Sequence, residues 1–174
     1  MRITLSGPPG SGTTTVGKIV AKKLNIDFVP ASLIFRQMAE IKGVSLLEFN
    51  KMCESDPECD KEMDFAQKEY MNKDNFVIDS RLSWYFIENA DFRVHIDADI
   101  SERARRAASR DNLSQEDALE KIKEREESEK RRYLDYYGID ITDMSVYDLV
   151  VNSTTTPAKE VAEMIVNKIQ DKEV

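Results

Sequence analysis

A glycine-rich turn near the amino terminus has the residue types and spacing of a phosphate-binding loop. Gly7 and Gly12 match the two glycines of the pattern G-x-x-x-x-G-K-S/T, and the apolar run Ile3–Leu5 before them is typical of a short strand. Glycines let successive N–H groups face inward and form a concave anion site, to which the following helix adds its positive end. We expect a polyphosphate to contact the loop through Gly7, Pro8, Pro9, Gly10, Ser11, Gly12, Thr13, Thr14 and Thr15.

Two positions of the loop decide which chemistry it can support. Thr14 has the hydroxyl that is expected to ligate a Mg²⁺ ion bridging two phosphates. Thr13 stands where the pattern has lysine, and a charge-assisted hydrogen bond to phosphate contributes roughly 1.5–3 kcal/mol. Lys18 lies more than a turn into the predicted helix and is not expected to reach the phosphates. The loop can therefore hold phosphate, but positive charge for catalysis has to come from elsewhere.

Arginines are concentrated in one part of the sequence. Seven of the eleven arginines lie between residues 103 and 132, and i,i+4 ion pairs with glutamates account for some of them. One helix face follows a 4-3-4-3-4 spacing and contains Ala118, Ile122, Arg125, Glu129, Arg132 and Tyr136. Arg103, Arg106 and Arg110 share a face of the preceding helix. Arginines that point inward need anions, so we expect at least two of these to contact phosphate.

Further polar residues follow the buried strand predicted at Phe76–Ile78. Ligands in open parallel sheets bind at the carboxyl ends of strands, so Arg81, which follows Asp79 and Ser80, is expected to meet a second phosphate group opposite the loop. Asp79 would order the Mg²⁺ shell or touch the acceptor, with capping of the strand end as the alternative. Arg36 lies midway along a predicted helix among apolar residues and is a second candidate on this side. A surface ion pair is the alternative for both arginines.

The alternation of strands and helices predicts an α/β fold with a five-stranded parallel sheet. We expect strands at 2–6, 28–29, 76–78, 93–96 and 149–151. Helix starts are predicted at Ser32, Ser45 with Glu48, Asp56-Pro57, Asp99 with Glu102, Ser114 with Asp117, and Thr156-Pro157. The long connection before residue 76 predicts a helical insertion at residues 30–73, and the charged helices at 106–140 predict a second insertion.

Composition narrows the class of protein. A chain of 174 residues with 41% hydrophobic residues suits a single compact domain. The net charge of −8 argues against nucleic acid as a partner, because such binding neutralises many phosphates. No apolar run approaches the ~20 residues that span a bilayer, and no signal-peptide pattern precedes the first strand. We therefore expect a cytoplasmic monomer that binds small molecules.

The remaining residues with reactive side chains do not predict a second site. Cys53 and Cys59 lack histidine neighbours and make a poor metal site, so reduced thiols are expected. His95 is the only histidine, and its place in a predicted strand favours a structural role.

Several segments resemble known families. The loop resembles that of the nucleoside monophosphate kinases. The segments ASLIFR (31–36), LLEFN (46–50), IDSRL (78–82), REESE (125–129) and YGID (137–140) resemble the archaeal-type cytidylate kinases, and the resemblance covers nearly the full chain. It implies a P-loop NTPase fold and transfer of the ATP γ-phosphoryl group to CMP or dCMP with Mg²⁺.

The resemblance also implies a division of labour along the chain. Residues 1–29, 74–105 and 141–174 would form the P-loop core, residues 30–73 the insertion that binds the nucleoside monophosphate, and residues 106–140 a lid. Arg36 and Arg81, with Asp79 and Ser80, would bind the acceptor. The lid would carry the arginines that act in catalysis, namely Arg106, Arg110, Arg125 and Arg132.

Two alternative functions stay open on the sequence alone. The first is an adenylate kinase or another small-molecule kinase on the same fold. The second is a regulatory module that binds ATP and has lost catalysis with its lysine at Thr13. Phosphoryl transfer needs positioning and positive charge rather than a nucleophile, so the arginines favour a kinase in which the lid replaces the charge of that lysine.

Overall fold

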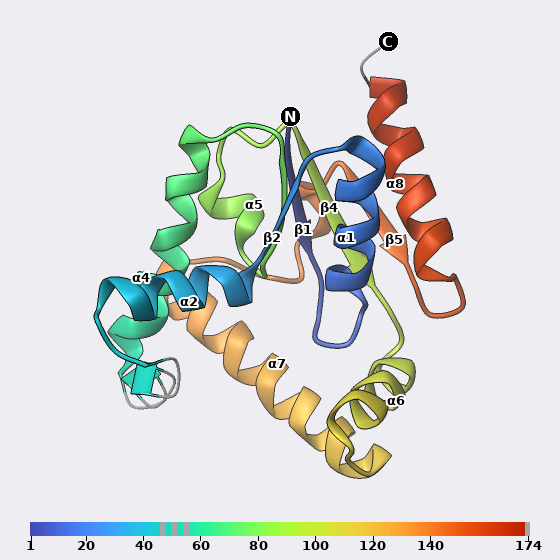
Figure 1. Cartoon of the computed structure of the whole chain (residues 1–174). Coiled ribbons are helices and arrows are strands. Elements are labelled where there is room, and N and C mark those ends of the chain that lie inside the picture. Colours follow the sequence, from blue (N-terminus) through green and yellow to red (C-terminus); the bar gives the residue numbers. More distant parts are fainter. Residues whose placement is uncertain (46–47, 50–51, 54–55, 173–174) are drawn as a thin grey trace.

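Five parallel strands form the central sheet of the computed structural model, which describes residues 1–45, 48–49, 52–53 and 56–172. The strands are β1 (Arg2–Ser6), β2 (Asp27–Pro30), β3 (Phe76–Asp79), β4 (Phe92–Asp97) and β5 (Leu149–Asn152). Their order is β2-β3-β1-β4-β5, as Figure 1 shows. Pairing of Asp79 with Leu5 and Pro30, and of Ser6 with His95, brings the carboxyl ends of four strands together at one edge.

Helices cover both faces of the sheet. They are α1 (Thr13–Leu24), α2 (Ala31–Ile41), α4 (Pro57–Ala66), α5 (Ser83–Phe86), α6 (Ile100–Asp111), α7 (Gln115–Tyr137) and α8 (Ala158–Lys172), with 3₁₀ helices η1 (Gln67–Asn72) and η2 (Met144–Val146). Successive strand residues point to opposite faces, so Val77 packs with α1 and α8, whereas Phe76 and Ile78 pack with η1. Burial on both faces explains why these strands are continuous apolar runs.

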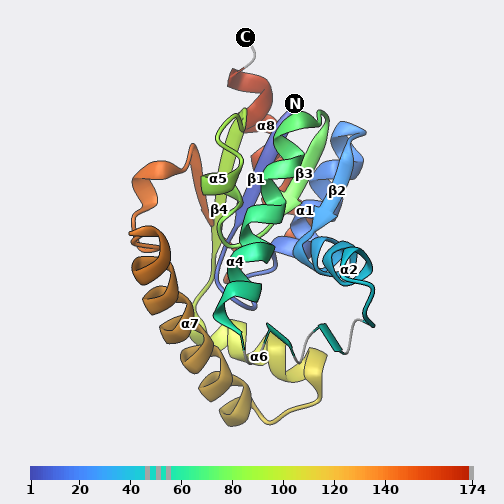
Figure 2. The same cartoon turned by 90° about the vertical axis from the view of Figure 1, so that its left-hand side faces the viewer.

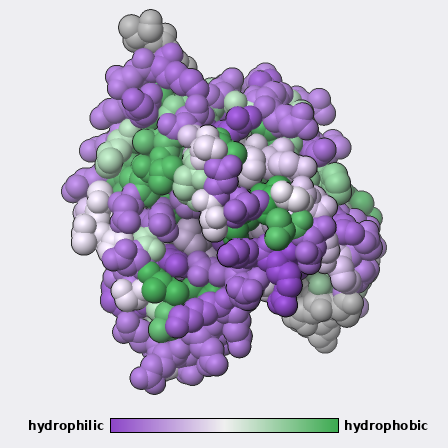
Figure 3. Space-filling model, turned by 180° about the vertical axis from the view of Figure 1, so that it is seen from behind, coloured by the Kyte–Doolittle hydropathy of each residue, from purple (hydrophilic) through white to green (hydrophobic). Residues whose placement is uncertain are grey.

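Two groups of helices extend beyond the carboxyl edge of the sheet. Helices α2 and α4 lie between β2 and β3 in the sequence, and α6 and α7 lie between β4 and β5. Figure 2 shows α2 and α7 on opposite sides, with α4 and the loop after β1 between them. Helix α7 ends beside α4, where Tyr137 contacts Phe65. Seen from behind, the lower end of the molecule, where α6 and α7 lie, is mostly hydrophilic (Figure 3).

The capping signals were only partly correct. Ser114 accepts a hydrogen bond from the amide of Asp117 at the start of α7, and Ser45 and Glu48 form their capping box. Ser32 does not cap α2, because that helix already begins at Ala31 with Pro30 at the N-cap position. Asp99 precedes α6 without a side-chain cap. Its amide donates to the Thr154 hydroxyl, and Glu102 pairs with Arg105 and Arg106, so no capping box forms.

The expectation of two reduced thiols was wrong. Cys53, which precedes α4, forms a disulfide with Cys59 in the first turn of that helix. Their Cα atoms lie 4.9 Å apart, inside the range that a disulfide requires. The expectation rested on the redox compartment, whereas this approach of two helical segments is a tertiary feature. His95 lies buried in β4 with its ring against Tyr147, and burial lowers its pKa, as suits a structural residue.

The helices of the described chain are of the kind that cover a globular core. None of them has both the length and the apolar character that crossing a bilayer requires.

Gly17 tests the packing of α1 on the sheet. A Cβ atom at this position would lie 2.5 Å from the Phe28 ring and 2.9 Å from Leu5. We expect Gly17→Ala to lower the free energy of unfolding by about 1–3 kcal/mol, because overpacking outweighs the gain of about 1 kcal/mol in helix propensity. Urea unfolding followed by circular dichroism measures the change. The exposed neighbour provides the control, since Lys18→Ala should stay within about 0.5 kcal/mol of the parent. A stabilised Gly17→Ala variant would contradict this packing.

Candidate active site

The loop between β1 and α1 has the backbone geometry of an anion site. Gly10 and Gly12 have φ values of +85° and +93°, a left-handed conformation that side chains disfavour. A Cβ atom on Gly10 would also lie 2.8 Å from the carbonyl oxygen of Arg103. The loop is closed by a hydrogen bond from the Ser11 amide to the Pro8 carbonyl, and Gly12 leads directly into α1. The glycines of the motif are therefore needed for this conformation, as the spacing predicts.

Two arginines of α6 hold the loop from behind. The buried Arg103 donates to the carbonyls of Ala98 and Pro9 and forms a 2.7 Å ion pair with Glu126 of α7. Arg106 donates to the Ser153 carbonyl at 2.6 Å and to the loop carbonyls of Gly10 and Ser11 at 3.4 Å. These contacts place Arg106 behind the loop, where it supports the loop backbone.

A carboxylate at the end of β3 faces the start of α1. The Thr14 hydroxyl donates to Asp79 Oδ2 at 2.6 Å. Burial raises the pKa of Asp79, and the hydroxyls of Thr14 and Thr13 oppose that shift. Thr13, at the lysine position of the motif, thus lies beside an acid and adds no positive charge.

Thr14 and Asp79 are the residues that could hold a cation. Hydroxyl and carboxylate oxygens suit Mg²⁺, which binds through one or two carboxylates together with phosphate oxygens and water. The described residues contain no cluster of three or more His, Cys, Asp or Glu side chains that would form a metal site from protein ligands alone. A cation beside Asp79 would therefore depend on the phosphates of a bound nucleotide.

Two cavities meet at the carboxyl edge of the sheet. The first, about 260 Å³, follows the loop and is lined by Gly7, Thr13 and Thr14, by Asp79 and Ser80, and by three arginines, Arg81, Arg110 and Arg125. The second, about 230 Å³, lies toward α2 and α4 and is lined by Ser80, Arg81, Arg125 and Arg132 at one end. Because Arg81 and Arg125 line both cavities, guanidinium groups stand where the two spaces join.

Glu129 of α7 links these arginines. Glu129 is 2% exposed. Its carboxylate accepts hydrogen bonds from Arg81 Nε at 2.6 Å and from Arg125 Nε at 2.7 Å. Two guanidiniums around one carboxylate leave net positive charge. The charge pattern of the sequence did not single out Glu129, although its place between Arg125 and Arg132 on one helix face is a usable signal.

The other candidates lie in different places. Arg110 lines the first cavity and pairs with its neighbour Asp111, and Arg132 lines the second. Arg36 is exposed on α2 and lines neither cavity. Thr15 and Lys18 are exposed on α1, and neither lines the first cavity.

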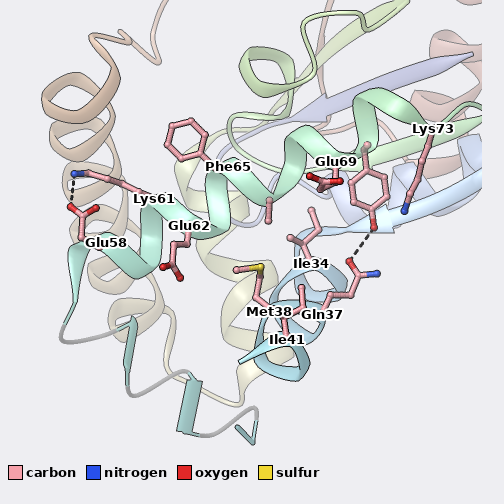
Figure 4. A pocket seen from close by; sticks show the side chains of 12 residues that line it. Ile34, Gln37, Met38, Ile41, Glu58, Lys61, Glu62, Phe65, Glu69 and Lys73 are labelled. Carbon is pink, nitrogen blue, oxygen red and sulfur yellow. Dashed lines mark hydrogen bonds and ion pairs between the residues drawn. The ribbon is translucent and has the colours of Figure 1, made fainter. Parts of the chain in front are cut away.

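A larger cavity of about 660 Å³ lies on the other side of α4, between that helix and α2 (Figure 4). Its polar groups partly satisfy one another, since Lys61 pairs with Glu58 and the Tyr70 hydroxyl donates to Gln37. It is lined by no loop residue and no arginine. This cavity is therefore not the phosphate site.

Comparison with known proteins assigns the family. The model of the cytidylate kinase-like family matches residues 2–155. The chain belongs to this family. A cytidylate kinase of Archaeoglobus fulgidus is 44% identical over 100% of this chain and 97% of its own length. A cytidylate kinase of Pyrococcus horikoshii is 49% identical over 87% of this chain and 79% of its own length. One of Sulfolobus acidocaldarius is 41% identical over 99% of this chain and 96% of its own length.

Solved structures show the same fold in more distant proteins. A shikimate kinase from Acinetobacter baumannii superimposes with a TM-score of 0.67 at 16% identity, over 99% of this chain and 94% of that one. An uncharacterized protein from Eubacterium ventriosum superimposes with a TM-score of 0.73 at 18% identity, over 98% of each chain. The cytidylate kinase-like chain therefore has the α/β fold of P-loop kinases, as its strand and helix pattern predicts.

The raised pKa of Asp79 leads to a prediction for stability and metal dependence. The folded protein holds this proton more tightly than the unfolded chain, so the free energy of unfolding falls as pH rises from about 4 through the folded pKa. Asp79→Asn removes the free-energy cost of ionising this buried carboxyl, and we expect the ligand-free protein to be more stable at neutral pH. ATP binding in the variant should no longer respond to Mg²⁺. Urea unfolding and titration calorimetry measure the two effects.

Asp135→Asn, at an exposed position of α7, is the matched control and should change neither property. An Asp79→Asn variant that is less stable at neutral pH and still responds to Mg²⁺ would refute the assignment.

Proposed function

We propose that this protein transfers the γ-phosphoryl group of ATP to CMP or dCMP and releases ADP with CDP or dCDP. The observation that carries the proposal is the junction of the two cavities at Arg81 and Arg125. One cavity follows an anion-binding loop and the other opens beside it, so donor and acceptor phosphates would meet at these two guanidiniums. Family membership supports the same reaction.

The donor would be held mainly by the backbone. Amides of the loop from Gly7 to Thr14 and the N-terminus of α1 would bind the β- and γ-phosphates. Thr14 and Asp79 would hold Mg²⁺, which would neutralise the negative charge that develops on the phosphates. The acceptor phosphate would lie against Ser80 and Arg81.

Arginines would supply the charge that Thr13 cannot. Phosphoryl transfer spreads negative charge over the equatorial oxygens, and fixed donors there lower the barrier. Arg125 and Arg132 of α7 would contact the transferring group, with Arg110 at the outer wall of the donor cavity. Arg106 would act through the loop that it holds. We propose that the protein works as a cytoplasmic monomer without nucleic acid.

An acceptor panel tests the function. CMP, dCMP, UMP and AMP are each incubated with ATP, with and without Mg²⁺, and the diphosphate product is separated and quantified. We expect CDP and dCDP to form in a Mg²⁺-dependent reaction, with little ATP hydrolysis in the absence of an acceptor. Tight ATP binding without any diphosphate product would instead identify a binding module, and AMP as the best acceptor would identify an adenylate kinase.

Single substitutions in α7 test the role of its arginines. We expect Arg125→Ala and Arg132→Ala each to lower kcat for CMP by about two to three decades, as loss of one oxyanion donor does elsewhere. Arg131→Ala is the matched control, because Arg131 is exposed on the same helix and lines neither cavity. Its kcat should stay near that of the parent. Losses below about threefold in both test variants would remove these arginines from the mechanism.

A further inference from the structure

The second cavity of the site, where the acceptor would bind, is here called the acceptor cavity. It has two chemically different ends. Ser80, Arg81 and Arg125 line the end that adjoins the phosphate loop, because they also line the first cavity. Ile34 and Phe35 of α2 and Met63 of α4 give the cavity an apolar wall. A nucleoside monophosphate has the same polarity, with an anionic phosphate and a flat base, so its base would lie between α2 and α4.

Two polar side chains interrupt this wall. Asp64 lies in the last turn of α4, and Gln67 begins η1 three residues later. The two side chains are therefore neighbours on one helical surface, and both line the acceptor cavity. Gln67 is 3% exposed, and its Oε1 has no hydrogen-bond partner among the described residues. Buried amide oxygens nearly always have a partner, so the arrangement points to a ligand that completes it.

Helix α7 holds the Asp64 side chain in its orientation. The Tyr137 hydroxyl donates to its Oδ2 at 2.9 Å. A carboxylate has about four lone-pair positions on its two oxygens, so Asp64 can accept from a substrate donor in addition to the contacts that it makes in the free protein. Asp64 can accept from a base but cannot donate to one while it is ionised.

The two side chains match the edge of cytosine. Cytosine presents an amino group at N4, which donates, and a ring nitrogen at N3, which accepts. We infer that Asp64 and Gln67 read the base of the acceptor: Asp64 accepts one N4 hydrogen, and the Gln67 amide accepts the other and donates to N3. This assignment rests on the proposed function.

The two residues have different effects on specificity. Uracil presents O4 and N3–H instead, and a glutamine amide that rotates by half a turn fits that edge equally well. Gln67 therefore binds either pyrimidine. The Asp64 carboxylate would face uracil O4 across a desolvated contact between two acceptors, so Asp64 is the residue that selects cytosine.

Steady-state kinetics with CMP and UMP separate these roles. We expect Asp64→Asn to lower the ratio of kcat/KM for CMP to that for UMP by at least about tenfold, because the asparagine amide can donate to O4. Gln67→Ala should raise KM for both nucleotides by about tenfold and leave the ratio within twofold. Competition binding of CMP and UMP to each variant without ATP gives the same comparison independently of catalysis.

Control substitutions lie on the opposite side of the same helices. Glu62 of α4 and Gln37 of α2 line the larger cavity (Figure 4). Glu62 also pairs with Lys42. Glu62→Gln and Gln37→Ala make the matching chemical changes and should alter neither KM nor the ratio. Urea unfolding of every variant identifies losses that come from the fold.

The possible failures are distinguishable. A parent protein that forms no CDP would refute the proposed function and this inference with it. In a second outcome, the parent forms CDP while Asp64→Asn lowers kcat/KM equally for CMP and UMP and so keeps the parent ratio. In that case Asp64 is only structural and the inference is wrong. An unchanged KM for CMP in Gln67→Ala would likewise remove Gln67 from the base site. Should Asp64→Asn fold poorly, Asp64→Ser decides, because its hydroxyl can donate to O4 and should shift the ratio toward UMP.

Discussion

The buried carboxylate of Glu129 is the interaction on which the site depends. A charge with almost no exposure is tolerated only when it is paired and hydrogen-bonded, and Glu129 meets this condition through Arg81 and Arg125. One of these arginines follows β3 and the other belongs to α7, so a single carboxylate ties the sheet edge to the helix beyond it. The pairing uses the Nε atoms, as the two short contacts show, and the remaining guanidinium donors can meet phosphate. Glu129 thereby orients the two guanidiniums in the ligand-free protein, which in the proposed mechanism would reduce the reorganisation that catalysis requires.

This arrangement offers an explanation for a phosphate loop without lysine. A lysine at position 13 would place its ammonium near the β- and γ-phosphates, but it would also lie beside the Asp79 carboxylate and compete with Mg²⁺ for it. In this chain the position holds a threonine whose hydroxyl acts on Asp79. If the proposed function holds, positive charge comes instead from Arg81, Arg125 and Arg132, which line the second cavity and would act on the transferring group and the acceptor together. In the proposed mechanism, binding and catalysis therefore rest on different elements: backbone amides hold the donor, and arginines of the strand end and α7 stabilise the transition state.

Local features of the sequence predict much of this structure. The strand, loop and first helix are correct because glycine spacing and apolar runs act over a few residues, and Asp79 with Arg81 follows from the rule that parallel strands share a functional edge. What the sequence did not show is tertiary. Arg36 stays a predicted acceptor ligand, and in the ligand-free protein it lies on α2 outside both cavities. The Cys53–Cys59 disulfide depends on the approach of two helical segments, and the role of Glu129 depends on which arginines surround it. Spacing along one helix does not specify what approaches it from another.

The position of the base-reading residues has a consequence for selectivity in the proposed reaction. Asp64 is bound to Tyr137 on α7, the same helix that carries Arg125 and Arg132. A base that binds Asp64 thus contacts the helix of the catalytic arginines through one intervening hydrogen bond, and a base that repels Asp64 disturbs the same connection. Correct binding at the base would favour the arrangement of α4 and α7 in which the arginines meet phosphate, whereas a wrong base would weaken both binding and the rate. Discrimination between pyrimidines can then exceed what one direct contact supplies, because the binding energy of the correct base also helps to assemble the site.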